Sequence, residues 1–441
     1  MGSAVATPTL ETETLTESIT PSAAAATADN ALGERFTKAD IVRFMLGFLI
    51  CGLLWVVPFA ASSQVLLPQR FRDEGFANPT ALIAQLNAVG AAVALIANLV
   101  FGALSDRSRS RFGRRTPYMV IGSALAGLSL FLAALAPSIP LILLCWAGFQ
   151  LGLNALLAPF LAVLSDRVPD TKRAQMSAAY GFGVTIGSTL GTIVGAWFIT
   201  NQLTGFIIAG IALGIAGLAT ALTWPKEPSA ANMPHVAFSV RSLLMSFKPP
   251  TQNCGDFYKA LVGRLLIMLG YYMIISYQLY VVEDYIGQDA QTAAATIALV
   301  SVCSMVASLV SMVVSGPLSD KIGRRKPLVI ACAVIIAIGF AVPFVWPTAT
   351  AMYVFGAVAG FGLGIYNTCD QALNVDVLPS KEEAGKDLGI LNLSNTFGQI
   401  FGPIVTSILF GVLGTYKPVF VLSIVALLAS IIFIATIRKA K

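Results

Sequence analysis

Two short stretches of the sequence decide the fold: GALSDRSRSRFGRRTP at residues 102–117 and GPLSDKIGRRKP at residues 316–327. Both begin with Gly-x-Leu-Ser-Asp, and both end with Gly-Arg-Arg-x-Pro. The correspondence continues along the chain, because an offset of 210 residues also carries Asp166 in SDRVPD onto Asp376 in VDVLPS. An internal repeat over this length predicts that the chain is built from two similar halves.

The composition around these stretches indicates that lipid surrounds most of the chain. Of the 441 residues, 56% are hydrophobic and 11% are charged, and the mean hydropathy is +0.79. Soluble proteins carry about 25% charged residues, so this chain has too few charges to cover a surface in contact with water. We therefore predict an all-α membrane protein, because a helix satisfies its own backbone hydrogen bonds inside a bilayer.

Twelve apolar runs, each of about 20 residues and so long enough to cross a bilayer, alternate with polar breaks. A polar linker at 225–259 separates the first six from the last six, which predicts an N-terminal six-helix bundle at 36–224 and a C-terminal six-helix bundle at 260–441. Residues 1–35 lack large apolar side chains, so we expect a disordered cytoplasmic tail. The runs cover residues 40–62, 81–104, 117–135, 139–164, 174–199, 204–224, 260–283, 291–317, 327–346, 349–377, 386–411 and 414–437.

The lysines and arginines predict the orientation of these helices, because basic residues concentrate in cytoplasmic loops. With the N-terminus in the cytoplasm, 25 of the 28 basic residues fall on the cytoplasmic side, five of them in the central linker region when Arg264, just after the linker, is counted with it. Arg70, Arg72 and Lys417 fall on the other side. We therefore expect a multi-pass protein of the cell membrane with both termini in the cytoplasm. The net charge of +6 is then a topology signal, and we expect no nucleic-acid partner.

The sequence offers little for catalysis or for binding a metal ion. The six cysteines are scattered without a C-x-x-C spacing, and the single histidine, His235, lies in the polar linker. We find no H-E-x-x-H motif and no Walker-type phosphate-binding loop. We therefore expect neither a cofactor nor an enzymatic activity, and no ATP-driven pump. A membrane enzyme or a receptor lacks support from any motif.

The repeated Gly-Asp-Arg-Arg element suits a cytoplasmic gate between helices. A glycine allows neighbouring helices to approach closely, and an aspartate accepts charge-assisted hydrogen bonds from arginines. Such a network can hold in one conformational state and break in another. In the alternative interpretation, the arginines only set the topology. The predicted gate residues are Gly102, Asp106, Arg114, Arg115, Asp166, Gly316, Asp320, Arg324, Arg325 and Asp376.

These two loops resemble the signature of the major facilitator superfamily, and the resemblance extends over residues 40–440. It implies the major facilitator fold, with twelve transmembrane helices in two six-helix bundles. It also implies a central site near the bilayer midplane and alternating access by rocking of the two halves.

A narrower resemblance concerns the fourth predicted helix. The stretch NALLAPFLAVLSD resembles the N-x-x-Q-G-P-x-R-A-L-x-A-D pattern of sucrose–proton symporters and of the related glycoside–pentoside–hexuronide transporters. Asn154, Pro159 and Asp166 fall in register, whereas Leu157 and Leu161 occupy the positions of the pattern's glutamine and arginine. The end of the seventh predicted helix, YVVEDYIG, resembles the T-D-W/F-M-G pattern of this branch.

Two acidic residues are candidates for proton coupling. Asp370 lies inside the tenth predicted span, where a charged side chain is costly. It either binds and releases a proton or pairs with an arginine of the predicted gate. Asp284 occupies the aspartate position of YVVEDYIG. It either meets a proton first or is a solvated loop acid.

Amide and aromatic side chains on several predicted helices suit a neutral polyhydroxylated ligand. The alternative is that these side chains only form hydrogen bonds between helices. The candidate cavity residues are Trp55, Gln64, Gln150, Asn154, Tyr271, Gln278, Tyr366, Asn367, Asn392, Asn395 and Gln399.

Taken with the resemblance, these features predict a secondary active transporter that moves a small polar solute, in particular a sugar or glycoside, by proton-coupled alternating access. The alternative is a proton-driven exporter of drugs or metabolites on the same fold. The expected partners are the small-molecule substrate, H+ and the lipid bilayer, and we expect a monomer.

Overall fold

The computed structural model describes residues 37–231, 249–251, 254–322, 324–379 and 384–438. The predicted tail at 1–35 lies outside these residues, as does much of the predicted linker. Within the described residues the secondary structure is helical throughout. This agrees with the all-α prediction, which follows from the need to satisfy every backbone polar group within lipid.

The first half of the chain begins with a helix whose start the sequence defines clearly. Thr37 caps α1, because its hydroxyl accepts a hydrogen bond from the Asp40 backbone while the Asp40 carboxylate accepts from the Thr37 backbone. The elements are α1 (Lys38–Ala61), the π-helical turn η1 (Ser62–Leu66), α2 (Leu67–Asp73), α3 (Pro79–Asp106), α4 (Thr116–Leu135), α5 (Ile139–Arg167), α6 (Asp170–Trp197), α7 (Gln202–Gly214) and α8 (Ala216–Thr223).

The second half repeats this order, and it starts earlier than expected, inside the predicted linker. Its first long helix ends at Ile275, and short helical turns follow where the sequence predicts one continuous helix to residue 283. The elements are α10 (Gly255–Ile275), α11 (Gln278–Tyr280), η2 (Val281–Tyr285), α12 (Ala290–Ile322), α13 (Lys326–Val345), α14 (Ala349–Asp376), α15 (Ala384–Leu413) and α16 (Lys417–Ala435).

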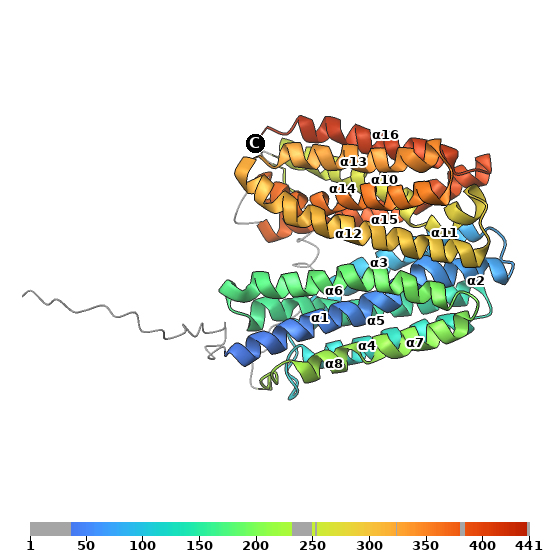
Figure 1. Ribbon diagram of the computed structural model, residues 1–441. Helices are drawn as coiled ribbons and strands as arrows, with labels where there is room; N and C mark the ends of the chain where they lie inside the picture. The colour runs from blue at the N-terminus through green and yellow to red at the C-terminus, as the bar shows by residue number, and fades with distance from the viewer. Residues whose placement is uncertain (1–36, 232–248, 252–253, 323, 380–383, 439–441) are drawn as a thin grey trace, which may run out of the picture.

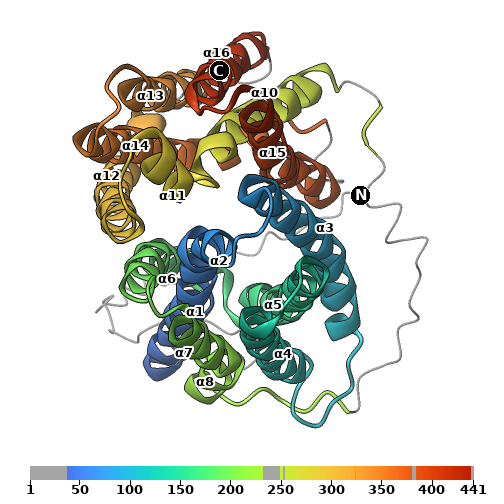
Figure 2. The ribbon, with the colours of Figure 1, turned by 90° about the vertical axis from the view of Figure 1, so that its right-hand side faces the viewer.

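Eleven segments among the described residues are long and apolar enough to cross a bilayer. A further long helix, α6, has 28 residues, and its glycines, serines and threonines lower its hydropathy. It packs along α1 and also contacts α12 of the other half (Figure 2). Together these segments make up the twelve membrane helices that the sequence predicts.

The helices form two bundles, one from α1–α8 and one from α10–α16 (Figure 2). The start of α1 and the end of α16 lie on one face of the molecule, which we call the terminal face, whereas α2 and α11 lie on the other, the opposite face (Figure 1). The bundles meet where α3 contacts α15 and where α6 contacts α12. Functional side chains on these four helices are therefore brought to the interface of the two halves.

Glycines allow the helices of each bundle to pack at short range. A Cβ atom added at Gly191 of α6 would lie 2.5 Å from the Val57 carbonyl oxygen of α1, and one at Gly152 of α5 would lie 2.5 Å from the Ala126 backbone nitrogen of α4. At Gly102 the outcome differs from the expectation, because an added Cβ would meet nothing within 4 Å. The close approach predicted at this gate glycine is therefore absent in this conformation.

Candidate functional site

A central cavity of about 410 Å³ lies between the two bundles. Helices α1, α3 and α5 and the turn η1 contribute most of its wall, and α10 and α15 close it from the second half. Its lining combines aromatic rings and neutral polar groups and contains no charged side chain among the described residues. The polar and aromatic side chains are Trp55, Phe59, Ser63, Gln64, Asn87, Trp146, Gln150, Asn154, Tyr272, Ser276 and Gln399.

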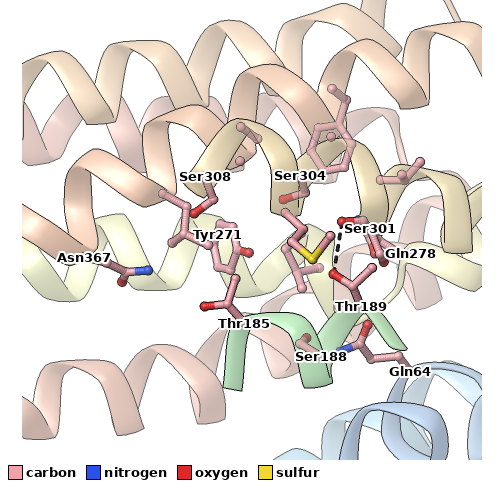
Figure 3. Close-up of a pocket in the computed structure, with 18 of the residues that line it drawn as sticks. Gln64, Thr185, Ser188, Thr189, Tyr271, Gln278, Ser301, Ser304, Ser308 and Asn367 are labelled. Atoms are coloured by element: carbon pink, nitrogen blue, oxygen red, sulfur yellow. Dashed lines mark hydrogen bonds between the residues drawn. The ribbon is translucent and has the colours of Figure 1, made fainter. Parts of the chain in front are cut away.

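A second cavity, of about 190 Å³, adjoins the central cavity at Gln64 and lies between α6 and α12 (Figure 3). Hydroxyl groups of both helices face each other across it, and the Thr189 hydroxyl donates to the Ser301 carbonyl oxygen at 3.3 Å. We call it the α6–α12 cavity. Its labelled polar side chains are Gln64, Thr185, Ser188, Thr189, Tyr271, Gln278, Ser301, Ser304, Ser308 and Asn367.

A third cavity, of about 420 Å³, extends from the central cavity toward the terminal face between α3 and α15. It shares Asn154 and Gln399 with the central cavity, so the two cavities adjoin at these amides. We call it the α3–α15 cavity. Its lining also contains Asn98, Asn392 and one charged residue, Lys386.

Nine of the eleven candidate cavity residues line one of these three cavities. Tyr366 and Asn395 do not, because both are engaged with a buried arginine described below. Trp55, Gln64, Gln150, Asn154 and Gln399 line the central cavity, Tyr271, Gln278 and Asn367 line the α6–α12 cavity, and Asn392 lines the α3–α15 cavity.

The sequence reading omitted several lining residues, of which the serines of α12 had a readable signal. Ser301, Ser304 and Ser308 recur at helical spacing, which places them on one face of α12. Asn87 and Trp146 also line the central cavity, and neither is among the candidates named from the sequence.

Behind Asn392, a buried ion pair joins two helices of the second half. Arg264 of α10 and Asp370 of α14 lie 3.2 Å apart, measured from Nε to Oδ2, and their side chains are only 2% and 5% exposed. The Asp370 carboxylate also accepts from the Asn374 amide at 3.0 Å. This corrects the sequence analysis, which counts Arg264 with the central linker region, whereas its side chain lies buried inside α10.

Arg264 is the centre of a polar network. Its Nε donates to the Tyr366 hydroxyl at 3.1 Å, and its Nη2 donates to the Asn392 amide oxygen at 3.0 Å. Nη1 has no hydrogen-bond partner among the described residues. The partner of Asp370 is thus an intramembrane arginine and not one from the predicted gate. We call Arg264, Tyr366, Asp370, Asn374, Asn392 and Asn395 the Arg264 network.

On the opposite face, an ion cluster joins the two halves. Arg72 of α2 contacts Glu283 at 2.9 Å and Asp284 at 2.5 Å, both on η2, and its guanidinium lies 4.1 Å from the centre of the Tyr280 ring. The Tyr280 hydroxyl donates to the Pro68 carbonyl oxygen of α2 at 2.7 Å. We call Arg72, Glu283 and Asp284 the opposite-face ion cluster. It places Asp284 in a contact between the halves, where the sequence allowed a solvated loop acid.

Glu283 is the least compensated member of this cluster. It lies beyond the end of its membrane span at Ile275, yet its side chain is only 6% exposed. Burial raises the pKa of the Glu283 carboxyl to about 7, an effect that Arg72 opposes and Asp284 reinforces.

On the terminal face, the predicted gate residues form ion pairs within each half. Asp166 at the end of α5 accepts from Arg114 at 2.5 Å and from Arg115 at 2.7 Å. Arg115 also reaches Asp106 at the end of α3, at 2.5 Å. These contacts tie together three helices of the first bundle.

In the second half, Arg325 pairs with Asp376 at 2.9 Å, and Arg324 is exposed. The side chains of the remaining two predicted gate residues, Gly316 and Asp320, lie outside the described ones. The ion pair of Arg325 and Asp376, like those of the first half, joins helices of the same half.

The comparison with known proteins accounts for this architecture. The family model described as Major Facilitator Superfamily matches residues 44–278 and 260–441. The chain belongs to this superfamily. It is therefore a membrane transporter and not an enzyme, as the sequence predicts.

Individual relatives of this superfamily member are distant. It is 28% identical over 295 residues to the MFS transporter asaE of Aspergillus flavus, a match that covers 65% of this chain and 63% of the relative. It is 25% identical over 352 residues to the uncharacterized MFS-type transporter YqjV of Bacillus subtilis, covering 77% and 80%. The match to asaE thus spans less than two thirds of that relative.

Solved structures share the fold at low sequence identity. The nucleoside transporter NupG matches with a TM-score of 0.69 at 15% identity, over 90% of this chain and all of the other. A bacterial homolog of the human lysosomal transporter Spinster, in an inward-facing and unoccupied conformation, matches with a TM-score of 0.67 at 16% identity, over 91% and 96%. Identities this low establish the fold alone.

Proposed function

We propose that this transporter moves a small uncharged polar solute, in particular a sugar or glycoside, across the cell membrane with protons as the coupling ion. The observation that carries the proposal is the uncharged central cavity, in which Gln64, Gln150 and Gln399 stand beside the rings of Trp55 and Trp146. Amides offer both donors and acceptors to hydroxyl groups, and aromatic faces cover the apolar side of a sugar ring. A charged substrate would leave its charge unpaired among these side chains.

The arrangement of contacts between the halves supports alternating access. On the opposite face, Tyr277 and Tyr280 join the halves by hydrogen bonds to the Thr80 and Pro68 carbonyl oxygens. The α3–α15 cavity leads instead toward the terminal face. Because the basic residues favour a cytoplasmic terminal face, the conformation corresponds to an inward-facing state, and rocking the halves would expose the same cavity on the other side.

We assign the coupling proton to Asp370, with Arg264 as its partner. A proton on Asp370 would neutralise the carboxylate and leave the Arg264 charge uncompensated in the interior. Arg264 would then have to strengthen its contacts with other acceptors, of which Asn392 lines the α3–α15 cavity. Protonation would in this way change the wall of the pathway.

The rival proposal is a proton-driven exporter of amphipathic metabolites or drugs. The observation that favours it is the aromatic cluster beside the central cavity, where the ring centroids of Trp146 and Phe149 lie 4.7 Å apart and that of Phe59 lies 6.2 Å from Trp146. Broad aromatic surfaces also accept apolar ligands. The two functions differ in substrate and in direction.

The test is uptake of labelled mono- and disaccharides into proteoliposomes under an imposed proton gradient. We expect accumulation of a sugar by the native protein. Asp370→Asn should abolish gradient-driven accumulation but retain exchange of labelled for unlabelled sugar, because neither Asp370 nor Asn392 lines the central cavity. Asp170→Asn, which alters an exposed acid paired only with nearby Arg173, serves as the matched control.

Two results would decide against this proposal. Extrusion of amphipathic dyes without sugar uptake would favour the exporter. Full accumulation by Asp370→Asn would remove Asp370 from proton coupling.

A further inference from the structure

We infer that closing the opposite face takes up a proton at Glu283, so that the opposite-face ion cluster is a second proton-binding site. The inference deepens the proposed function, because it rests on the opposite face being one of the two gates of a transporter. It adds a site to Asp370 and Asp284, the two acids that the sequence singles out.

The cluster contains more acid than base. One guanidinium, Arg72, serves two carboxylates, Glu283 and Asp284, at 2.9 and 2.5 Å. The other arginine of α2, Arg70, is occupied by Glu74 at 2.6 Å. With both carboxylates ionised, the closed gate therefore holds one negative charge in excess.

The two carboxylates differ in their surroundings. The Asp284 side chain is 33% exposed, so solvent supports its charge. The Glu283 side chain is 6% exposed, and neither of its carboxylate oxygens has a hydrogen-bond partner among the described residues, although Oε2 lies within the ion pair with Arg72. A proton on Glu283 would remove the excess charge while leaving the pair of Arg72 and Asp284 intact.

The other groups near Glu283 do not supply a second cation. Asp73 of α2 accepts from the Gln69 and Gln202 side chains, and Asp289 caps the start of α12 through Thr292. Both aspartates add negative potential at Glu283 and so favour its protonation. The titratable and charged groups that face the cluster are Asp73, Tyr280, Asp289 and Tyr416, besides the three members themselves.

The sign of the pH effect follows from linkage. In the closed gate the pKa of Glu283 is raised to about 7 by burial. When the halves separate, water reaches the carboxyl and its pKa falls toward the ordinary value, near 4. A proton binds more tightly to the state with the higher pKa, so acid stabilises the closed gate and alkali favours opening.

The test measures gate opening directly and needs no substrate. Nitroxide labels are placed at the exposed positions Ala77, between α2 and α3, and Gln291, at the start of α12, in a background in which the six native cysteines are replaced. Their separation is measured by pulsed electron resonance in lipid nanodiscs from pH 5 to pH 9. We expect the ratio of short to long separations to fall about a hundredfold as the pH rises over this range, because the pKa of Glu283 is about 7 in the closed gate and near its ordinary value in the open one.

The substitution Glu283→Gln mimics the protonated acid, so we expect short separations at every pH. Glu74→Gln alters an exposed acid of the same face that pairs only with Arg70, and it should behave like the native residue. Asp284→Asn frees Arg72 for Glu283, and the transition should move to lower pH. Thermal unfolding of each variant shows whether the fold is kept.

Two outcomes would overturn the inference: a pH response that Glu283→Gln leaves unaltered, or no pH response in the native gate. Both are distinguishable from failure of the proposed function. A transporter without sugar uptake or proton coupling could still show the Glu283-dependent distances, and a proton-coupled sugar transporter could lack them.

Discussion

The two halves of this transporter have different kinds of side chain at the same position of the repeat, an aromatic ring on α5 and a carboxylate on α14. Phe160 stands as far before Asp166 on α5 as Asp370 stands before Asp376 on α14. In the first half, Phe160 packs against Phe48 of α1 with ring centroids 5.0 Å apart. In the second half, Asp370 pairs instead with Arg264 of α10.

The residues that contact Phe160 and Asp370, namely Phe48 and Arg264, also lie at matching positions of the two halves. Phe48 follows Gly47, whose missing side chain admits Trp224 at the end of the first bundle. Arg264 follows Gly263, whose missing side chain admits Ile434 at the end of α16. The same helix contact is therefore filled once by rings and once by charges.

This difference indicates that the same helix contact can be made without an ion pair. Rings of Phe48, Phe160 and Trp224 fill the first-half site without an ion pair between them, with centroids 5.0–5.4 Å apart. A buried ion pair adds little net stability, because desolvation offsets the attraction of the charges. This contrast is consistent with the proposed role of the second-half charges in coupling, and the variants below test it.

The largest expected effect comes from breaking the pair on one side only. Arg264→Leu would leave the Asp370 carboxylate buried without its cation, and we expect a loss of about 3–5 kcal/mol in the free energy of unfolding. The measurement is thermal or denaturant-induced unfolding of the purified protein in detergent.

The double variant Arg264→Leu with Asp370→Leu gives the second half an apolar contact like that of the first. We expect it to recover most of the lost stability while lacking proton-driven accumulation. Equal instability of the single and double variants would contradict the comparison, since it would mean that the charges themselves hold α10 against α14.

The sequence predicted the fold almost completely, for physical reasons that are local. The length and apolarity of a run of residues are enough to predict a membrane helix. The similar loops at 102–117 and 316–327 are enough to predict that the two halves are repeats of each other. The errors lie where a helix is interrupted. Nothing in YQLYVVEDY predicts the break after Ile275, because the stretch contains neither the proline nor the glycine that usually interrupts a helix.

The site was predictable in its neutral polar lining and not in its ion pairs. Arg264 lies only five residues after Lys259, so the sequence analysis counts it with the linker. The sequence does not show that the Arg264 side chain, near the start of α10, is buried between helices. Arg72 and Glu283 lie far apart in the chain, and only the meeting of the two halves brings them together.

A smaller effect is expected from Tyr366→Phe, which tests the difference between the two halves at a single hydrogen bond, the one between Arg264 and Tyr366. Tyr366 bonds to Arg264 at 3.1 Å, whereas an offset of 210 residues places Leu156 at the matching position of the first half. Removing the hydroxyl should cost about 1–2 kcal/mol in the free energy of unfolding, because a donor of the charged guanidinium loses an acceptor. It should also shift the pH dependence of gradient-driven uptake. Leu156→Ile, a swap of similar volume in the first half, is the control and should leave that pH dependence unchanged.

The smallest effect is expected from Phe160→Leu in the aromatic cluster. The side chain is fully buried against Phe48, Trp224 and Tyr180, so the smaller residue should cost about 1 kcal/mol by loosening the packing. Because no charge in this cluster changes, the ratio of gradient-driven uptake to exchange should equal that of the native protein, measured in the same proteoliposomes. A loss of coupling in Phe160→Leu as great as in Asp370→Asn would mean that the first half shares the proton-linked step, and the contrast between rings and charges would no longer separate structure from coupling.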